Sequence, residues 1–168
     1  MSDDRDVILF PEAEIIQPFA MAFMRMMFAH ARFEQEVRWL QRAITKNPKF
    51  DKRWKTCERP MRMARLIENH PGQVEDREAS EIERILTDAI KPCDERNLLA
   101  HGRWYRFDPK TLTISIRGEQ KGEPEWSDYT ESAILQIDGE LRALATDLYK
   151  VRSDIEHRRG DHDVPDLS

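Results

Sequence analysis

Residues 16–44, IQPFAMAFMRMMFAHARFEQEVRWLQRAI, carry the pattern from which the fold is first predicted. A seam of mostly apolar residues recurs there at alternating intervals of three and four, which places the side chains on one face of a helix. The seam consists of Ile16, Phe19, Phe23, Met26, His30, Phe33, Val37, Leu40 and Ile44. Because Asn47-Pro48 interrupts the pattern, we expect one long helix that ends before residue 47. Pro18 is expected in its first turn or at a kink.

A second seam with the same spacing runs down the C-terminal part of the chain. It consists of Ile134, Ile137, Leu141, Leu144, Leu148, Val151 and Ile155. Ser127 and Asp128 precede this seam and are candidate N-caps, because their side chains can accept hydrogen bonds from the first backbone N–H groups of a helix. Two long helices with matching apolar stripes are expected to pack against each other.

Shorter helical patterns lie between the two seams, at about residues 60–69 and 74–90. The residues expected to face inward are Met61, Ala64, Leu66 and Ile67 in the first pattern, and Ile82, Ile85, Leu86, Ala89 and Ile90 in the second. Lys91-Pro92 should bend or end the second of these helices. Residues 94–101 are therefore expected to form a helix of their own, with Asp94 near its N-cap.

The periodicity changes after Gly102. Residues 104–107 and 112–117 alternate around Asp108-Pro109-Lys110-Thr111, which is typical of a β-hairpin, and Leu112, Ile114 and Ile116 would share its buried face. The sequence thus predicts an all-α bundle of four to five helices, with a small hairpin at about 103–117 inserted after the helix of residues 94–101. We expect a helical domain over residues 11–157, a flexible arm over 1–10 and a disordered tail over 158–168.

Charge is distributed unevenly along the chain. The formal net charge is −5, which argues against binding nucleic acid over the whole surface, but residues 42–59 carry +5. Aromatic residues are interleaved in this basic segment, and such a combination can follow a single RNA strand. The candidate RNA-binding residues are Lys49, Lys52, Arg53, Trp54 and Lys55. The alternative is a solvated charged surface with Phe50 and Trp54 turned inward.

Several other classes of protein are disfavoured. The acidic N-terminus lacks the order of a secretion signal, and the longest apolar run, residues 19–29, is interrupted by Arg25 and too short to cross a membrane, so we expect a cytoplasmic protein. Cys57 and Cys93 are far apart and suggest neither a disulfide framework nor a zinc site. His30 and Glu34 have the spacing of a metal-binding pair, but no third ligand is evident, so no metal or other cofactor is expected. A buried, hydrogen-bonded core histidine is the favoured interpretation of His30, and the alternative is a role in the cleft.

The polar residues best suited to phosphate and acid–base chemistry are in the stretch Arg96-Asn97-Leu98-Leu99-Ala100-His101-Gly102. On a helix, Asn97 and His101 share a face and Arg96 lies one step around it. A guanidinium matches phosphate oxygens, and an imidazole can act as acid or base near neutral pH. A structural alternative is a helix stop, with Arg96 at the helix C-terminus and His101 closing the last turn beside Gly102.

This stretch, followed by Arg103-Trp104 so that its end reads Gly-Arg-Trp, resembles the R-x4-6-H signature of HEPN domains. These are small helical bundles that include metal-independent endoribonucleases. The resemblance covers the motif closely and the helical scaffold loosely. It implies attack of an RNA 2′-hydroxyl on the adjacent phosphorus to give a 2′,3′-cyclic phosphate. His101 would be the acid or base, Arg96 would stabilise the transition state and Asn97 would orient the phosphate or the imidazole.

The resemblance also implies a homodimer in which two motifs face one cleft, and it suggests a toxin or stress-response nuclease with an antitoxin or other protein partner. The hairpin departs from the minimal family pattern. It could shape the cleft, present Arg103 and Arg106 to phosphate, or cover one end of the core. Two other functions stay open: a non-catalytic module that binds RNA, a nucleotide or a protein, and a structural protein whose seams serve oligomerisation.

Overall fold

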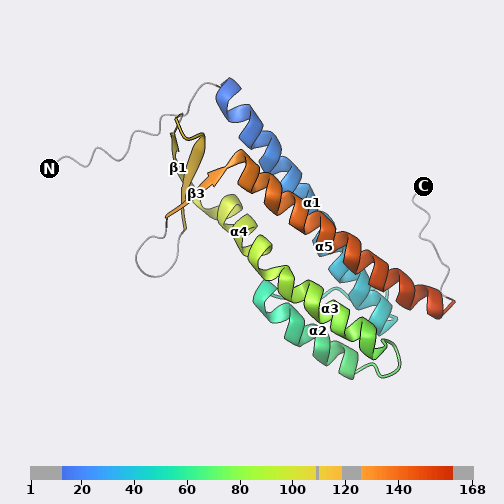
Figure 1. Cartoon of the computed structure of the whole chain (residues 1–168). Coiled ribbons are helices and arrows are strands. Elements are labelled where there is room, and N and C mark those ends of the chain that lie inside the picture. Colours follow the sequence, from blue (N-terminus) through green and yellow to red (C-terminus); the bar gives the residue numbers. More distant parts are fainter. Residues whose placement is uncertain (1–12, 109, 119–125, 161–168) are drawn as a thin grey trace.

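The computed structural model describes residues 13–108, 110–118 and 126–160 (Figure 1). Its helices are α1 (Ala13–Thr45), the 3-10 turn η1 (Thr56–Glu58), α2 (Arg59–Glu68), α3 (Asp76–Asp88), α4 (Ile90–His101) and α5 (Glu131–Arg158). The strands are β1 (Arg103–Asp108), β2 (Thr113–Arg117) and β3 (Trp126–Thr130), which form one antiparallel sheet in the order β1-β2-β3. The predicted helical bundle with a small hairpin after the fourth helix is confirmed, and the sheet is one strand larger than expected.

The long helices α1 and α5 lie side by side along their length and form the largest interface of the fold (Figure 1). Every predicted seam residue of α5 is buried, and so are the described seam residues of α1 apart from the half-buried Phe23. The side chain of Ile16 lies outside the described part. Pro18 falls inside α1. An ion pair also joins the two helices, because Nε of the partly buried Arg152 lies 3.1 Å from Oε2 of the buried Glu36.

Of the three short α-helices between α1 and the sheet, α2 and α4 differ from the prediction in detail. In α2, Met63 and Leu66 are buried, whereas Met61 and Ala64 face solvent, so the inward face is rotated from the one expected. Helix α4 begins at Ile90 rather than at Asp94. Pro92 lies in its first turn, where a missing N–H removes no hydrogen bond within α4. The preceding helix α3 ends at Asp88, four residues before Pro92, so the expected end of that helix ahead of Lys91-Pro92 is found. In α3, the predicted inward residues Ile82, Ile85 and Leu86 are buried, as is Ala89 just beyond its end.

Strand β3 was not expected, and its presence moves the start of α5. Ser127 and Asp128, the predicted N-caps, pair with β2 within β3. The N-cap is Thr130, whose Oγ1 accepts a hydrogen bond from the backbone N–H of Ala133 at 3.1 Å. Leu112 is exposed in the β1–β2 turn with φ of 50°, so only Ile114 and Ile116 of its predicted group are buried.

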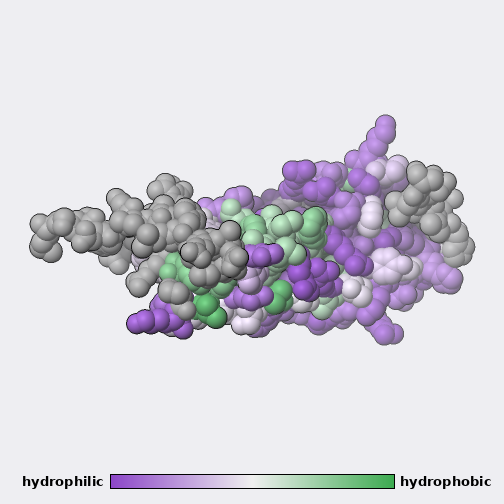
Figure 2. Space-filling model, turned by 90° about the horizontal axis from the view of Figure 1, so that it is seen from above, coloured by the Kyte–Doolittle hydropathy of each residue, from purple (hydrophilic) through white to green (hydrophobic). Residues whose placement is uncertain are grey.

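The sheet packs on the N-terminal half of α1 through aromatic contacts. The ring of Phe107 meets that of Phe19 edge-on at 5.7 Å between centroids, and Trp104 meets Phe23 at the same distance. Viewed from above, hydrophobic side chains gather in the half of the molecule that carries the sheet, whereas the other half of that face is hydrophilic (Figure 2).

The expected N-terminal arm, and all of the expected C-terminal tail after Gly160, lie outside the described residues. Arg158 belongs to α5 and forms ion pairs with Glu75 at 2.5 Å and Glu78 at 2.7 Å. Among the helices described here, none is both long enough and apolar enough to cross a membrane.

Candidate functional site

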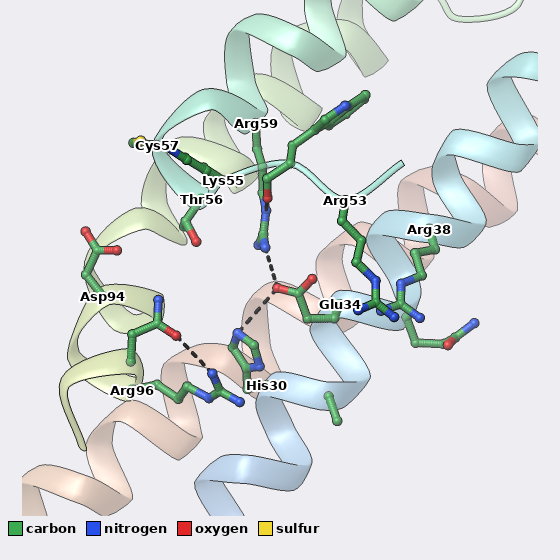
Figure 3. Close-up of a pocket in the computed structure, with 14 residues that line it drawn as sticks. His30, Glu34, Arg38, Arg53, Lys55, Thr56, Cys57, Arg59, Asp94 and Arg96 are labelled. Atoms are coloured by element: carbon green, nitrogen blue, oxygen red, sulfur yellow. Dashed lines mark hydrogen bonds and ion pairs between the residues drawn. The ribbon is translucent and has the colours of Figure 1, made fainter. Parts of the chain in front are cut away.

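A pocket of about 720 Å³ lies where α1, the segment leading into α2, and α4 come together (Figure 3). Its basic lining residues are Arg38, Arg53, Lys55, Arg59 and Arg96. The carboxylates of the lining are those of Glu34 and Asp94. The lining is therefore positive although the chain as a whole carries −5. Such a pocket concentrates anions locally while the remaining surface repels them.

Arg59 and Glu34 form the centre of this pocket. Nη2 of Arg59, the first residue of α2, lies 2.5 Å from Oε1 of Glu34 on α1. Nε of Arg59 donates to the backbone oxygen of Trp54 at 3.4 Å, and the guanidinium lies over the ring of Phe33 at 5.9 Å from its centroid. The Arg59 side chain is only 8% exposed. Its position is thus fixed from three sides.

His30 joins the same network one helical turn before Glu34. Its Nε2 lies 3.3 Å from Oε1 of Glu34. Burial, reinforced by the nearby positive charge of Arg96, lowers the pKa of His30 from 6.5 to about 4, although Glu34 acts in the opposite direction. His30 is therefore neutral at pH 7. It is buried, as the sequence favoured, but it also lines the pocket.

Arg96 and Asn97 reach the pocket from α4. Nη1 of Arg96 donates to Oδ1 of Asn97 at 2.9 Å, so the two neighbouring side chains hold each other in place. Nε of Arg96 is buried and has no hydrogen-bond partner within the described residues. Arg96 lies five residues before the last residue of α4 and does not cap that helix, so this part of the helix-stop alternative does not hold.

His101 has a different environment from Arg96 and Asn97. It is the last residue of α4, it is exposed, and it does not line the pocket. Gly102 follows with extended backbone, and its N–H donates to the oxygen of Leu98 at 2.7 Å. His101 is thus one turn beyond Asn97 along the helix, outside the pocket wall. The side chains of Arg103 and Arg106, in β1, are outside the described part of the structure.

The basic segment is divided by the fold. Arg53, Trp54 and Lys55 line the pocket, whereas Lys49 and Lys52 are exposed and do not. Trp54 and Phe50 both pack against the hydrophobic core, which is the arrangement that the solvated-surface alternative assumed. The ammonium of Lys52 lies over the ring of Phe50, 5.6 Å from its centroid.

The pocket also contains residues that the sequence did not single out. Arg59 stood out only as one of the charges of the basic segment, and no spacing signal distinguishes it from its neighbours. Proline directly after it is a helix-start signal that places it at the beginning of α2. Thr56 and Cys57 of the turn η1 complete the wall between Lys55 and Arg59.

Within the described residues, no group of three or more His, Cys, Asp or Glu side chains is arranged to hold a metal ion. No family model matches the chain, and no curated protein and no solved structure matches it either.

Proposed function

We propose that this chain binds RNA through its phosphate groups in the pocket and cleaves it as a metal-independent, HEPN-like endoribonuclease of the toxin or stress-response type. The observation that carries the proposal is that Arg96 and Asn97 line the same pocket as Arg53 and Lys55. Two parts of the sequence that independently suggested phosphate chemistry are therefore adjacent in the fold.

The proposed reaction needs three groups around one phosphodiester. The 2′-oxygen of the RNA attacks phosphorus, the bond to the 5′-oxygen breaks, and the products are a 2′,3′-cyclic phosphate and a 5′-hydroxyl. His101 takes the proton from the 2′-hydroxyl or gives one to the leaving 5′-oxygen, and water takes or gives the other proton. The guanidinium of Arg96 stabilises the charge that develops on the phosphate oxygens, and Asn97 orients them.

The exposure of His101 fits this reaction in an assembly of two chains. In the homodimer that we propose, each cleft receives polar groups from both copies of the motif, so a histidine at the rim of one chain's pocket serves a phosphate held by the other. An apolar stripe on α1 is available for the contact. It consists of Met21, Met24 and Phe28, which are 55%, 52% and 68% exposed and follow helical spacing.

A second candidate function is a non-catalytic module that binds RNA or a nucleotide in the pocket. The specific observation in its favour is that the imidazole inside the pocket belongs to His30, which is bound to Glu34, whereas His101 lies outside. A ligand could then be held without a free imidazole beside it.

Incubation of the purified protein with single-stranded RNA in EDTA distinguishes the two. We expect cleavage with 2′,3′-cyclic phosphate ends, and loss of cleavage in Arg96→Ala and His101→Ala with little change in melting temperature. Arg65→Ala is the matched control, because Arg65 is an exposed arginine of α2 that does not line the pocket. Binding without cleavage in the wild type would support the second candidate, and full activity in either motif variant would exclude the first.

A further inference from the structure

Arg59 has hydrogen-bonding capacity that the described part of the chain does not satisfy. Its Nη1 is buried and has no partner there, although its Nη2 and Nε are both engaged. A buried donor without an acceptor is costly, and a buried guanidinium faced by one carboxylate is more costly still. An arrangement of this kind at the wall of a pocket points to a ligand that supplies further acceptor oxygens.

Arg96 presents a second unsatisfied guanidinium to the same space. Its buried Nε lacks a partner among the described residues, and its Nη1 bonds only to the neutral amide of Asn97. Figure 3 shows Arg59 entering the pocket from α2 and Arg96 from α4, with His30 and Glu34 of α1 between them. The two guanidiniums therefore approach one volume from different helices.

The exposed side of the pocket adds more positive charge. Arg53 and Lys55 are exposed lining residues, and neither has a carboxylate partner in the described part of the chain. Glu34 is the one carboxylate at the centre, and Asp94 is exposed at the wall. With His30 neutral, the charge of the lining favours a ligand with more than one negative charge.

We propose that this pocket is a binding site for the phosphate group of a nucleotide or of free phosphate, in which a phosphate oxygen replaces Oε1 of Glu34 at Arg59 and other oxygens are bound by Arg96. Planar guanidinium groups match phosphate oxygens in geometry as well as in charge. A volume of about 720 Å³ accommodates a nucleoside attached to the phosphate. The site rests on the phosphate binding proposed above and deepens it, because it assigns a role to Arg59; it does not depend on whether RNA is cut.

Glu34 has a defined role in this site, as the internal anion with which the ligand competes. Its side chain is 25% exposed, so it has access to solvent when it leaves Arg59. Glutamine at this position keeps an oxygen for Arg59 but removes the charge. The proposal therefore requires that Glu34→Gln bind phosphate more tightly than the wild type, an effect opposite to that of damaging the pocket.

Isothermal titration of the full chain with inorganic phosphate, adenosine 5′-monophosphate and adenosine, at constant ionic strength, tests the assignment. We expect binding of both phosphates and none of adenosine. Similar affinity for the two identifies the phosphate itself as the recognised group, and tighter binding of the monophosphate identifies a nucleotide. Absence of binding by both phosphates would overturn the proposal.

Variants make the test specific for Arg59. Arg59→Lys keeps a positive charge beside Glu34 but loses the planar fork, so we expect affinity for phosphate to fall about tenfold. Arg62→Lys, on the same helix but outside the pocket, is the matched control and should bind as the wild type does. Circular dichroism checks that each variant is folded. Should Arg59→Lys fail to fold, the Glu34→Gln variant decides, because unchanged or weaker binding there contradicts the proposed competition.

The same protein separates this inference from the proposed nuclease. A wild-type chain that binds phosphate but leaves RNA intact contradicts only the cleavage. A wild-type chain that cleaves RNA but binds neither phosphate nor adenosine 5′-monophosphate contradicts only the site at Arg59.

Discussion

Nε2 of His30 lies 3.3 Å from Oε1 of Glu34, and the same carboxylate oxygen lies 2.5 Å from Nη2 of Arg59. Protonation of His30 would thus place a third charge beside a partly buried ion pair. Burial is the largest cause that lowers the pKa of His30 to about 4, and the positive charge of Arg96 adds to it. The folded protein therefore resists protonation at a position where the unfolded chain accepts a proton.

Stability should consequently depend on pH through His30. Above pH 6.5 the imidazole is neutral in both states, and between pH 6.5 and about 4 only the unfolded chain binds the proton. The contribution to the free energy of unfolding then falls by about 1.4 kcal/mol per unit decrease in pH. In His30→Gln this loss should be absent. Urea denaturation from pH 7 to pH 4.5 measures the difference in free energy of unfolding between the two proteins, and the titration of the other groups cancels in this difference. The same pH dependence in both proteins would contradict the prediction.

Gly102 should be required for the close approach of α4 to the sheet. A Cβ atom there would stand 2.5 Å from Cγ2 of Ile116 and 2.5 Å from the backbone oxygen of Leu98. Because the backbone oxygen cannot move without disturbing the last turn of α4, Gly102→Ala should destabilise the protein by about 1–3 kcal/mol in urea denaturation.

Gly139 provides the matched control for this substitution. It lies within α5, and a Cβ atom added there meets nothing within 4 Å. Gly139→Ala should stabilise the protein by about 0.5–1 kcal/mol, because alanine loses less conformational entropy in a helix. Equal effects of the two substitutions would show that the contact with Ile116 does not exclude a side chain at residue 102.

The sequence predicted best those elements whose signal extends over many turns. The seams of α1 and α5 contain enough repeats for one phase to be unambiguous, and their described side chains are buried as expected, apart from the half-buried Phe23. Helix α2 has only ten residues, and its predicted inward face was wrong: Met61 was expected to be buried, whereas Met63 is buried and Met61 is exposed. Strand β3 has five residues with little alternation, and it forms because β2 offers an unpaired edge, which is a property of the folded sheet.

The site was predictable only in its parts. Spacing on a helix placed Arg96 and Asn97 on adjacent faces, and charge counting identified the region of Arg53 and Lys55. Their convergence depends on how α1, α4 and the start of α2 pack, which one sequence does not encode in any local pattern. Arg59 becomes distinctive only once burial separates it from the exposed Lys52, which carries the same charge.

The division of the basic segment leads to a prediction for RNA binding. Lys55 lines the pocket whereas Lys52 does not, so Lys55→Gln should weaken RNA binding more than Lys52→Gln. Each lost contact with a phosphate of a single strand lowers the slope of log Kobs against log salt by about 0.7. Fluorescence anisotropy at several salt concentrations measures this slope. If both variants lower the slope equally, RNA follows the whole segment. If both keep the wild-type slope, the segment is a solvated surface.

The proposed dimer makes a prediction about complementation between chains. His101 lies outside the pocket that contains Arg96, so a shared site would combine Arg96 of one chain with His101 of the other. A heterodimer of Arg96→Ala and His101→Ala chains then retains one intact pairing, and the purified heterodimer should recover about half of the wild-type cleavage rate although each homodimer is inactive. If instead both residues act within one chain, every site of the heterodimer lacks one of them. Refolding the two variants together with different affinity tags and assaying the doubly tagged species decides between these arrangements, because no recovered cleavage under conditions where the wild type is active would exclude the shared site.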